Sequence, residues 1–585
     1  MDKLLSKLNK DELLNELEKW FSNDSSWDSE WRDNAKVWYD YYHGRHWTSE
    51  EIEALQERGQ AVTTYNHIKP AIDSVIGSER QNRPKVTMAA RTLDDGTLAE
   101  AKSKLYDYIC YNTRSDDEVD KMVLDAFVTG KGWIYVAPEF EKDKDNTDIY
   151  HSYIDYRDVF IDALSKRDDL SDCRHLHYAV YTDFDIIKSM FPKIMDNSAT
   201  ENVFGFQSSS DDEIWYHSGD RKRPRLISSW FKNENGDIST AIWVKGQILY
   251  FNKKPYKMNR YPFVQFTVNR DLDNKPYGLV KTMVSAQDEV NKRHSKALHY
   301  LNAKQVLAEE DAFIDWSQAQ KTLAKPDGIT KLNDGALSNG KIQIIDNTAL
   351  ASTHIQMMQI ARDNILYTAG LNPASVGQAS QYESAKKTNM SIAQAQNSIV
   401  PTLNKLRIAR FELANITMKL VPEFYTDDRV IRIIEPNGQY SFMPVNAIKL
   451  LDDGTLLKMN DLTADDVDVI IEDAPRGLNE REEQFAQLLQ IQGQTSRPIP
   501  MEILLRYSSI KDKHQLANDL QQYFNLEGQL QQAQAQMEQM AKQIQDLGGV
   551  IEQRDSIITQ VQSARAVDKE VSKAKEKMNL TLGLM

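Results

Sequence analysis

The stretch Tyr65–Arg91, YNHIKPAIDSVIGSERQNRPKVTMAAR, holds a helix, a break and a strand in immediate succession. Its first half spaces apolar residues at the intervals of an amphipathic helix. The segment Gln81–Pro84 should end this helix, because a proline pushes the residue before it out of helical geometry. An extended apolar run, Val86–Ala90, then follows. The stretch contains no catalytic nucleophile motif, metal cluster or phosphate loop, so it gives no sign of a reaction centre.

Length and composition indicate a soluble protein built from several parts. At 585 residues the chain exceeds what one core usually supports, so about two to four substructures are expected. No apolar run reaches the roughly 18 residues that a membrane helix needs, and the charged N-terminus is not a signal peptide. The two cysteines, Cys110 and Cys173, are far apart. This spacing excludes a disulfide framework and fits a reducing cytoplasmic origin.

The net charge of -15 bears on any role with nucleic acid. Proteins that grip DNA by its phosphates are usually basic. The simplest interpretation is therefore an acidic protein without a nucleic-acid role, and composition alone favours it. The alternative is a surface past which DNA slides without sticking, since like charge lowers affinity for phosphate while a few Lys or Arg keep contact transient.

The first 270 residues are predicted to be helices followed by short strands. Residues 1–60 carry many aromatic side chains at near-helical spacing, which favours a core over a ligand site. Helices are expected at Leu98–Tyr111 and Asp116–Thr129. The second should end at Gly130–Gly132, where glycines suit a helix C-cap and a tight turn, and lead into a strand at Trp133–Ala137. A phosphate loop would need the opposite order, strand before helix.

Short strands are expected from 150 to 270, with a polar loop at 197–220. The patterns predict strands at Arg174–Tyr181 and Tyr261–Val268 and a hairpin at Ala241–Phe251, turning at Lys245-Gly246.

Two long helices are predicted around a turn-rich module in mid-chain. Leu279–Lys304 lacks Gly and Pro and keeps a helical apolar period, and so does Thr353–Thr368. Residues 306–350 between them collect turn signals and end in an apolar strand, Ile342–Ile345. A polar loop, Ala374–Glu383, comes next.

The C-terminal part should contain a long helix, a set of strands and a heptad tail. The helix is expected at Ser384–Leu420 with a kink at Pro401, and the strands within 428–475. Apolar residues then step by four and three over about five heptads, which predicts helix–helix packing, although Gly548-Gly549 should bend or weaken the helix. The row includes Leu530, Met537, Ile544, Ile551 and Ile558.

Catalytic chemistry has weak support. Acids alternate with apolar residues across Asp465–Asp473 and could place two carboxylates on one strand face, as a two-metal nuclease requires. A solvated strand face is the favoured interpretation. The histidines are scattered; His175 and His177 share a strand face, but neither is near a Cys or an acid at a metal-like interval. No catalytic residue, metal site or cofactor is predicted, and no nucleotide-binding loop is present.

Positive charge gathers near the mid-chain helices. It comes from Lys292, Arg293, Lys296 and Lys304 on the first helix, and from Lys386 and Lys387 after the polar loop. On sequence alone, an exposed helix face is favoured over a binding surface.

Four motifs, in order, resemble those of the portal proteins of tailed double-stranded DNA bacteriophages, in particular the podovirus-type family. Tyr41–Trp47 is similar to its Y-x-G-x-x-W opening, and Tyr65–Arg91 to its N-terminal signature. Asp125–Gly132 resembles a helix that ends in a double glycine before a strand. Asp158–Ala163, continuing to Asp169–Asp172 (DLSD), is the fourth. The resemblance covers roughly residues 40–420, and the C-terminal third matches only in character.

The resemblance implies an α+β, mostly helical portal fold that assembles as a ring, usually of twelve subunits. The implied parts are a wing at 1–270, a first stem helix at 271–305, a clip at 306–350, a second stem helix at 351–370, a tunnel loop at 371–385, a long helix toward the crown at 386–427, a β return to the wing at 428–475, crown helices at 476–525 and a C-terminal heptad helix or barrel at 526–585.

The function that the resemblance implies is mechanical. The ring would stand at one capsid vertex of the virion, after assembly in the host bacterial cytoplasm, and would pass double-stranded DNA non-specifically during packaging and ejection. The implied partners are the terminase large subunit, which hydrolyses ATP itself, scaffolding and major capsid proteins, and head-completion or tail adaptor proteins. No membrane partner is expected.

Residue roles also follow from the resemblance. The tail row named above would hold copies together. The basic residues named above, with Gln378 and Gln381 of the tunnel loop, would line the DNA channel, although these glutamines replace a dense basic cluster. The clip would dock terminase and adaptor through Trp316, Lys321, Lys325, Asp327, Lys331 and Asp334.

Two other function classes remain open at this point. The nuclease using Asp465–Asp473 predicts metal-dependent cleavage that is lost in Asp466→Ala or Asp468→Ala. A coiled-coil scaffold predicts that deletion of 526–585 abolishes assembly, whereas a portal ring should survive that loss.

Overall fold

The computed structural model describes most of the chain: residues 10–81, 83–90, 96–140, 147–192, 223–302, 305–323, 328–345, 348–371, 397–426, 429–434, 440–450, 456–463, 467–472, 487–492 and 513–582. The chain divides into two compact units, Met1–Pro475 and Arg476–Met585. Helix and strand are both present and helix predominates, which confirms the α+β class. Among the described helices, none has the length and apolarity to cross a bilayer.

Five helices make up the N-terminal part. They are α1 (Lys10–Tyr42), α2 (Ser49–Glu57), α3 (Ile68–Gln81), α4 (Gly96–Asn112) and α5 (Ser115–Thr129). A capping box starts α2, where Thr48 and Glu51 bond each other's backbone N–H.

The aromatic side chains of α1 mostly fill the core, as the sequence predicts. Trp31, Trp38 and Tyr42 are buried, whereas Trp27 is 41% exposed. The Trp31 indole N–H donates to Thr129 O at 2.9 Å, so α1 is bonded to the end of α5.

Two antiparallel sheets follow. In the first, β2 (Lys131–Phe140) lies between β3 (Thr147–Ile154) and β9 (Phe263–Thr267). The second sheet has the order β4-β5-β6-β7-β8. Its strands are β4 (Val159–Ile161), β5 (His175–Tyr181), β6 (Arg225–Lys232), β7 (Ile238–Val244) and β8 (Gln247–Asn252).

The predicted strands in this region are confirmed, and so is the hairpin: β7 and β8 join through the turn Lys245-Gly246. A short helix, α6 (Phe184–Met190), lies between β5 and β6, and the small pair β10 (Asn269–Arg270) and β11 (Pro276–Tyr277) precedes the mid-chain helices. The predicted polar loop at 197–220 lies outside the described residues.

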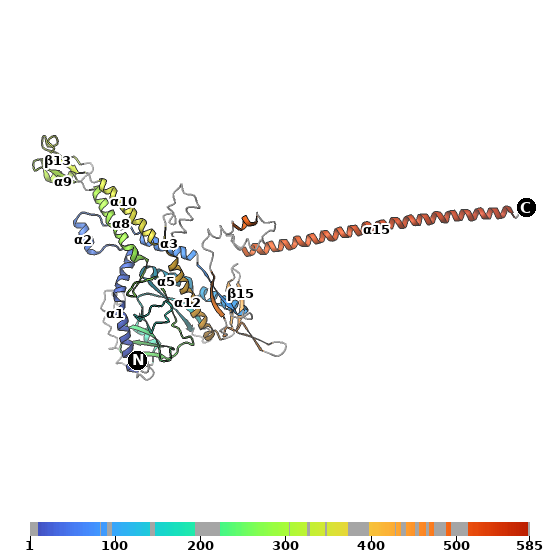
Figure 1. Ribbon diagram of the computed structural model, residues 1–585, viewed down its shortest axis with the longest axis horizontal. Helices are drawn as coiled ribbons and strands as arrows, with labels where there is room; N and C mark the ends of the chain where they lie inside the picture. The colour runs from blue at the N-terminus through green and yellow to red at the C-terminus, as the bar shows by residue number, and fades with distance from the viewer. Residues whose placement is uncertain are drawn as a thin grey trace. The chain divides into compact units, whose positions relative to one another are not determined.

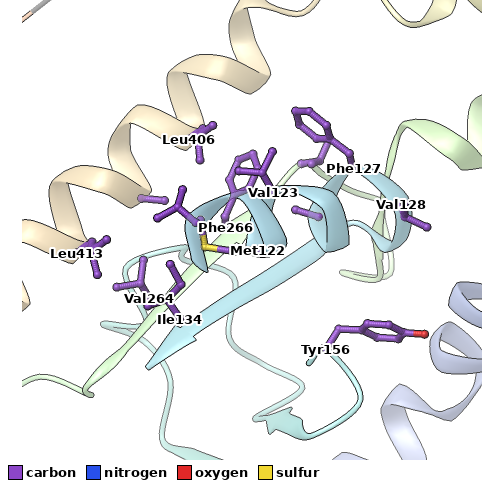
Figure 2. Packing of buried hydrophobic residues seen from close by; sticks show 14 of the residues in the cluster. Met122, Val123, Phe127, Val128, Ile134, Tyr156, Val264, Phe266, Leu406 and Leu413 are labelled. Carbon is purple, nitrogen blue, oxygen red and sulfur yellow. The ribbon is translucent and has the colours of Figure 1, made fainter. Parts of the chain in front are cut away.

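One large core joins segments that are far apart in sequence. Met122, Val123 and Phe127 of α5 meet Ile134, Val264 and Phe266 of the first sheet, with Leu406 and Leu413 from α12 (Val400–Phe424), as Figure 2 shows. Burying a side chain such as Phe127 or Phe266 contributes about 1.5–3 kcal/mol. Helix α12 is therefore held against α5 and the first sheet by apolar packing.

The turn between α5 and β2 leaves no room for side chains. Gly130 has φ +108°, and a Cβ on it would lie 2.3 Å from Tyr277 N. A Cβ on Gly132 would lie 2.0 Å from Met122 O. The predicted helix cap and tight turn are confirmed. The close approach of Tyr277 requires glycine at position 130, and that of Met122 O requires glycine at position 132.

Two antiparallel helices bracket a small module, as predicted. The helices α8 (Leu279–Asn302) and α10 (Thr348–Thr368) run side by side, with α9 (Trp316–Leu323) and β13 (Ile342–Ile345) at their far end (Figure 1). In the module, β12 (Gln305–Ala308) pairs with β13 in antiparallel register. The second helix begins at Thr348, earlier than the expected Thr353.

The strands after α12 form three two-stranded sheets. Two are local hairpins: β14 (Arg429–Ile434) with β15 (Tyr440–Val445), and β16 (Ala447–Leu450) with β17 (Leu456–Met459). The third is non-local, since β18 (Val467–Glu472) pairs with β1 (Lys85–Ala90). The apolar run Val86–Ala90 thus pairs with a strand near residue 470.

One expectation about helix shape is wrong, and a second stays a prediction. Pro401 does not kink a longer helix; it lies in the first turn of α12, where a missing N–H costs nothing. The helix α15 (Lys513–Leu582) runs through Gly548-Gly549 without a break, and the expected bend or weakening at these glycines stays a prediction. The expected helix start at Ser384 lies outside the described residues. Of the helices expected at 476–525, only residues 487–492, which are helical, and 513–525, which belong to α15, are described.

Candidate functional site

The candidate site is the helix pair α8 and α10 with the module at its end. Along α8, Val280, Met283 and Val290 are buried and belong to the main core. From α10, Ala361 and Ile365 join the same core. The pair is therefore fixed to the body at one end and carries the module at the other.

Two buried amides on α8 determine where this helix leaves the body. Gln287 accepts from His67 N–H at 2.9 Å and donates to Tyr65 O at 2.6 Å. Asn291 accepts from Tyr65 N–H at 3.1 Å and contacts His46 Nδ1 at 2.8 Å. These side chains satisfy the backbone of the opening stretch at the point where it turns into α3, so the stretch serves as the anchor of α8.

Asn66 completes this anchor at the start of α3. Its side-chain oxygen accepts from the backbone N–H of Ile68 at 3.0 Å and of Lys69 at 3.1 Å, as a helix N-cap does. Its amide N–H donates to Tyr42 O at 2.8 Å. One residue therefore joins the end of α1 to the beginning of α3.

The Arg83 segment at the other end of α3 is an ion-pair hub. Arg83 contacts Asp116 at 2.6 Å and Glu79 at 3.3 Å, and it also pairs with Asp120. Glu79 in turn accepts from Arg410 of α12 at 2.8 Å, with both side chains buried. The hub ties α3, α5 and α12 together.

The predicted channel residues on α8 are largely charge-compensated. Lys292 Nζ lies 3.2 Å from Glu51 Oε1, and Arg293 donates to Glu289 at 2.6 Å. Lys296 is exposed. Exposed pairs of this kind contribute about 0–1 kcal/mol, so their main effect is to weaken the positive field of this face.

His354 on α10 faces the same basic residues. Its Nδ1 lies 3.5 Å from Arg293 Nη1, and its ring stacks on Tyr300 with centroids 5.5 Å apart. Burial lowers the pKa of His354, and the charges of Arg293 and Lys296 lower it further. The imidazole adds no positive charge to this face near neutral pH.

The remaining predicted channel residues have no structural assignment. Lys304, Gln378, Gln381, Lys386 and Lys387 lie outside the described residues.

An apolar row on α10 faces away from its own chain. Leu350, Met357, Ile360 and Tyr367 fall within about 100° of one another around the helix axis. Their exposure ranges from 41% at Met357 to 80% at Tyr367. A run of exposed apolar side chains on one helix face marks a surface that another protein covers.

The module has a small core and an exposed rim. Ala312, Phe313 and Ala319 form the core. Trp316 is 49% exposed; its indole N–H donates to Glu310 O at 3.0 Å, and its ring meets Phe313 edge to face.

Of the other predicted docking residues, Lys321, Lys331 and Asp334 are exposed. Lys325 and Asp327 lie outside the described residues.

The tail carries an exposed apolar row on α15. Leu530, Met537, Ile544, Ile551 and Ile558 are between 41% and 69% exposed on α15. Their spacing of seven residues is that of a coiled-coil seam.

The acids of the nuclease alternative do not form a described cluster. Asp465, Asp466 and Asp473 lie outside the described residues. Asp468 is on β18, in register with Ala89 of β1.

Sequence reasoning missed one constellation. Asp24 of α1 lies beside His175 and His177 of β5, with ligand atoms all within 4.8 Å of one another. The sequence signal was the pair of histidines on one strand face; the acid came from a different element.

Comparisons with known proteins agree on one family. The family model described as phage P22-like portal protein matches residues 18–579. A portal protein of Helicobacter pylori bacteriophage KHP30 is 23% identical over 418 residues, which covers 70% of this chain. The match spans 66% of that relative, slightly less than two thirds of its length.

Proposed function

The chain belongs to the phage P22-like portal protein family, and on that premise we propose that its copies close into a ring at one vertex of a phage capsid. Double-stranded DNA passes through the bore of this ring during packaging and ejection. The role is structural and mechanical, and the family gives no support to the nuclease alternative.

The observation that carries the proposal is the apolar row on α10. In one chain, Leu350, Met357, Ile360 and Tyr367 face solvent, although α10 packs on α8 along its other side. Covering this row with a neighbouring copy removes apolar surface from water, the main favourable term in association. A head-to-tail contact of this kind, repeated with a fixed rotation, closes a ring.

The charge pattern of α8 supports passage of DNA without tight binding. Lys292 and Arg293 are paired with acids, and the chain has a net charge of -15. Binding to phosphate strengthens with each cation that replaces a counterion. A face with few uncompensated cations, repeated in about twelve copies, therefore touches DNA weakly at many points, which suits sliding.

The module between α8 and α10 is the proposed docking surface. Its exposed Trp316, Lys321, Lys331 and Asp334 are available to a partner. Trp is enriched where protein interfaces concentrate binding energy. We assign this surface to the terminase large subunit during packaging and to a head-completion or tail adaptor protein afterwards.

The test is the size and shape of the purified full-length chain. Negative-stain electron microscopy and light scattering should show a ring of roughly twelve subunits. The double variant Met357→Glu/Ile360→Glu places charge in the apolar row and should yield monomers or small oligomers.

The control is Gln359→Glu, which adds a negative charge at an exposed position on another face of α10. It should still form rings. A wild-type chain that stays monomeric at high concentration contradicts the proposal.

A further inference from the structure

We propose that Asp24, His175 and His177 bind a divalent first-row transition metal ion, best matched by Zn²⁺, which fastens α1 to the five-stranded sheet. The inference does not depend on the proposed function. It rests on distances, on unpaired buried atoms, on the partners of His177 and on the charge of the site.

The spacing of the three ligand atoms fits a metal between them. Asp24 Oδ2 lies 2.9 Å from His175 Nδ1 and 3.5 Å from His177 Nε2. In a tetrahedral zinc site with metal–ligand bonds of about 2.0–2.2 Å, neighbouring ligand atoms lie ~3.3 Å apart. The two observed separations bracket this value.

The same three atoms have no hydrogen-bond partner within the described residues. Asp24 Oδ2, His175 Nδ1 and His177 Nε2 are buried and make no contact with hydrogen-bond geometry, although Asp24 lies within ion-pair distance of both rings. A metal ion bound by all three atoms would satisfy them together.

The far side of His177 has a hydrogen-bond partner that suits the metal-binding form of its ring. Its Nδ1 lies 2.7 Å from Ser229 Oγ, which also accepts from the Trp243 indole N–H at 2.7 Å. When Nδ1–H donates to Ser229, the lone pair is on Nε2, directed at Asp24. Histidines that bind metals are oriented in this way by an outer hydrogen bond.

The surroundings make an unpaired carboxylate costly. His177 is fully buried and the Asp24 side chain is 4% exposed. Trp20 stacks on His175 and Phe21 meets His177 edge to face. Aromatic rings therefore surround the three ligand groups, and Asp24 has little access to solvent. A divalent ion offsets the charge of the Asp24 carboxylate.

The position of Asp24 also singles it out. Leu17 and Phe21 precede it on the same face of α1 and pack against the five-stranded sheet, so the helical period leads one to expect another apolar residue. Because His175 is 13% exposed, water can reach the site and occupy a fourth position. The ion therefore acts as a cross-link between α1 and β5.

The experiment uses the full-length chain, stripped with chelator and titrated with Zn²⁺ or Co²⁺ alone. Elemental analysis should find about one Zn²⁺ per chain, and thermal unfolding should shift upward with Zn²⁺. Co²⁺ should give the intense visible absorption of a four-coordinate site. Asp24→Asn and His175→Gln should each lose the absorption and the thermal shift, with affinity falling more than ~100-fold.

The control is His43→Gln, which removes an exposed histidine at the end of α1; it should bind metal as the wild type does. Equal binding by Asp24→Asn and the wild type overturns the proposal. So does the absence of visible absorption when the wild-type chain is saturated with Co²⁺, a result that needs no variant to fold.

Discussion

Single residues determine how closely the parts of the body approach one another. At Gly130 and Gly132 the backbone of another segment occupies the space of a side chain. At Gln287 and Asn291 the opposite holds, since polar side chains fill the gap and satisfy backbone groups of the opening stretch. Close backbone packing at the glycines and hydrogen bonds from the buried amides together fix where α8 begins and where it leaves the body.

Replacement of Gly132 should be among the most damaging single changes in the chain. A Cβ there would lie 2.0 Å from Met122 O, a backbone atom that cannot swing aside. We expect Gly132→Ala to cost at least ~3 kcal/mol, measured as a lower unfolding midpoint in denaturant. The control, Gly548→Ala, meets nothing within 4 Å and should stabilise α15 by up to about 1 kcal/mol. Equal midpoints for Gly132→Ala and the wild type would refute the packing argument.

His151 should make the body sensitive to acid. It is buried between Ser115 Oγ at 2.7 Å and Thr417 Oγ1 at 2.9 Å, and burial lowers its pKa to about 4 from 6.5. Between these values the unfolded chain binds the proton and the folded chain does not, so stability falls as pH drops from 6.5 toward 4. The loss is about 3 kcal/mol.

Denaturant titrations from pH 7 to pH 4 measure this effect. The His151→Gln variant should lose less stability than the wild type across that window. The same pH slope in both proteins would show that other groups are responsible.

Residue-level prediction from sequence succeeded where the signal was local and failed where it was not. The glycine cap after Thr129 could be recognised because helix, cap and strand are consecutive. The cluster of Asp24 with His175 and His177 could not, because its acid comes from a helix that reaches the strand only after the chain has folded.

At the scale of elements, the structure is organised around helices and strands that pair with elements later in the sequence. The helices α8 and α10 pair across the small module, and β18 returns to β1. The helix pair was predictable from apolar period and turn signals. The β1–β18 pairing was not, since period-2 patterns identify strands but not their partners. The kink expected at Pro401 failed because a proline in a first turn and one in a helix interior look alike in sequence.

Loss of the Gln287 anchor should loosen α8 without unfolding the whole body. Gln287→Leu leaves His67 N–H and Tyr65 O without their partner, at a cost of about 1–3 kcal/mol for each buried group. Hydrogen exchange should accelerate at the His67 amide and along the first turns of α3. The matched control is Gln359→Leu, the same change at an exposed position of α10. If hydrogen exchange in Gln287→Leu equals that of the wild type, Gln287 does not anchor α8.

At the scale of the whole molecule, the apolar rows on α10 and α15 are both exposed to solvent in the single chain. They belong to different compact units of the chain, so their contributions to assembly can be separated. The family match covers both units, from residue 18 to 579. The ring proposal places the essential contact on α10, whereas a coiled-coil scaffold would place it on α15.

Deletion of residues 526–585 decides between these two surfaces. If α10 carries the ring, the shortened chain should still form rings in negative stain, with the mass per subunit lowered by the missing tail. Its stability in denaturant should be close to that of the full chain, because the side chains of the tail row are largely exposed and little apolar burial is lost with them. Combining the deletion with Met357→Glu/Ile360→Glu should then abolish the rings. If the shortened chain is monomeric and its fold is unaltered, the assembly contact lies on α15, and the coiled-coil scaffold is favoured.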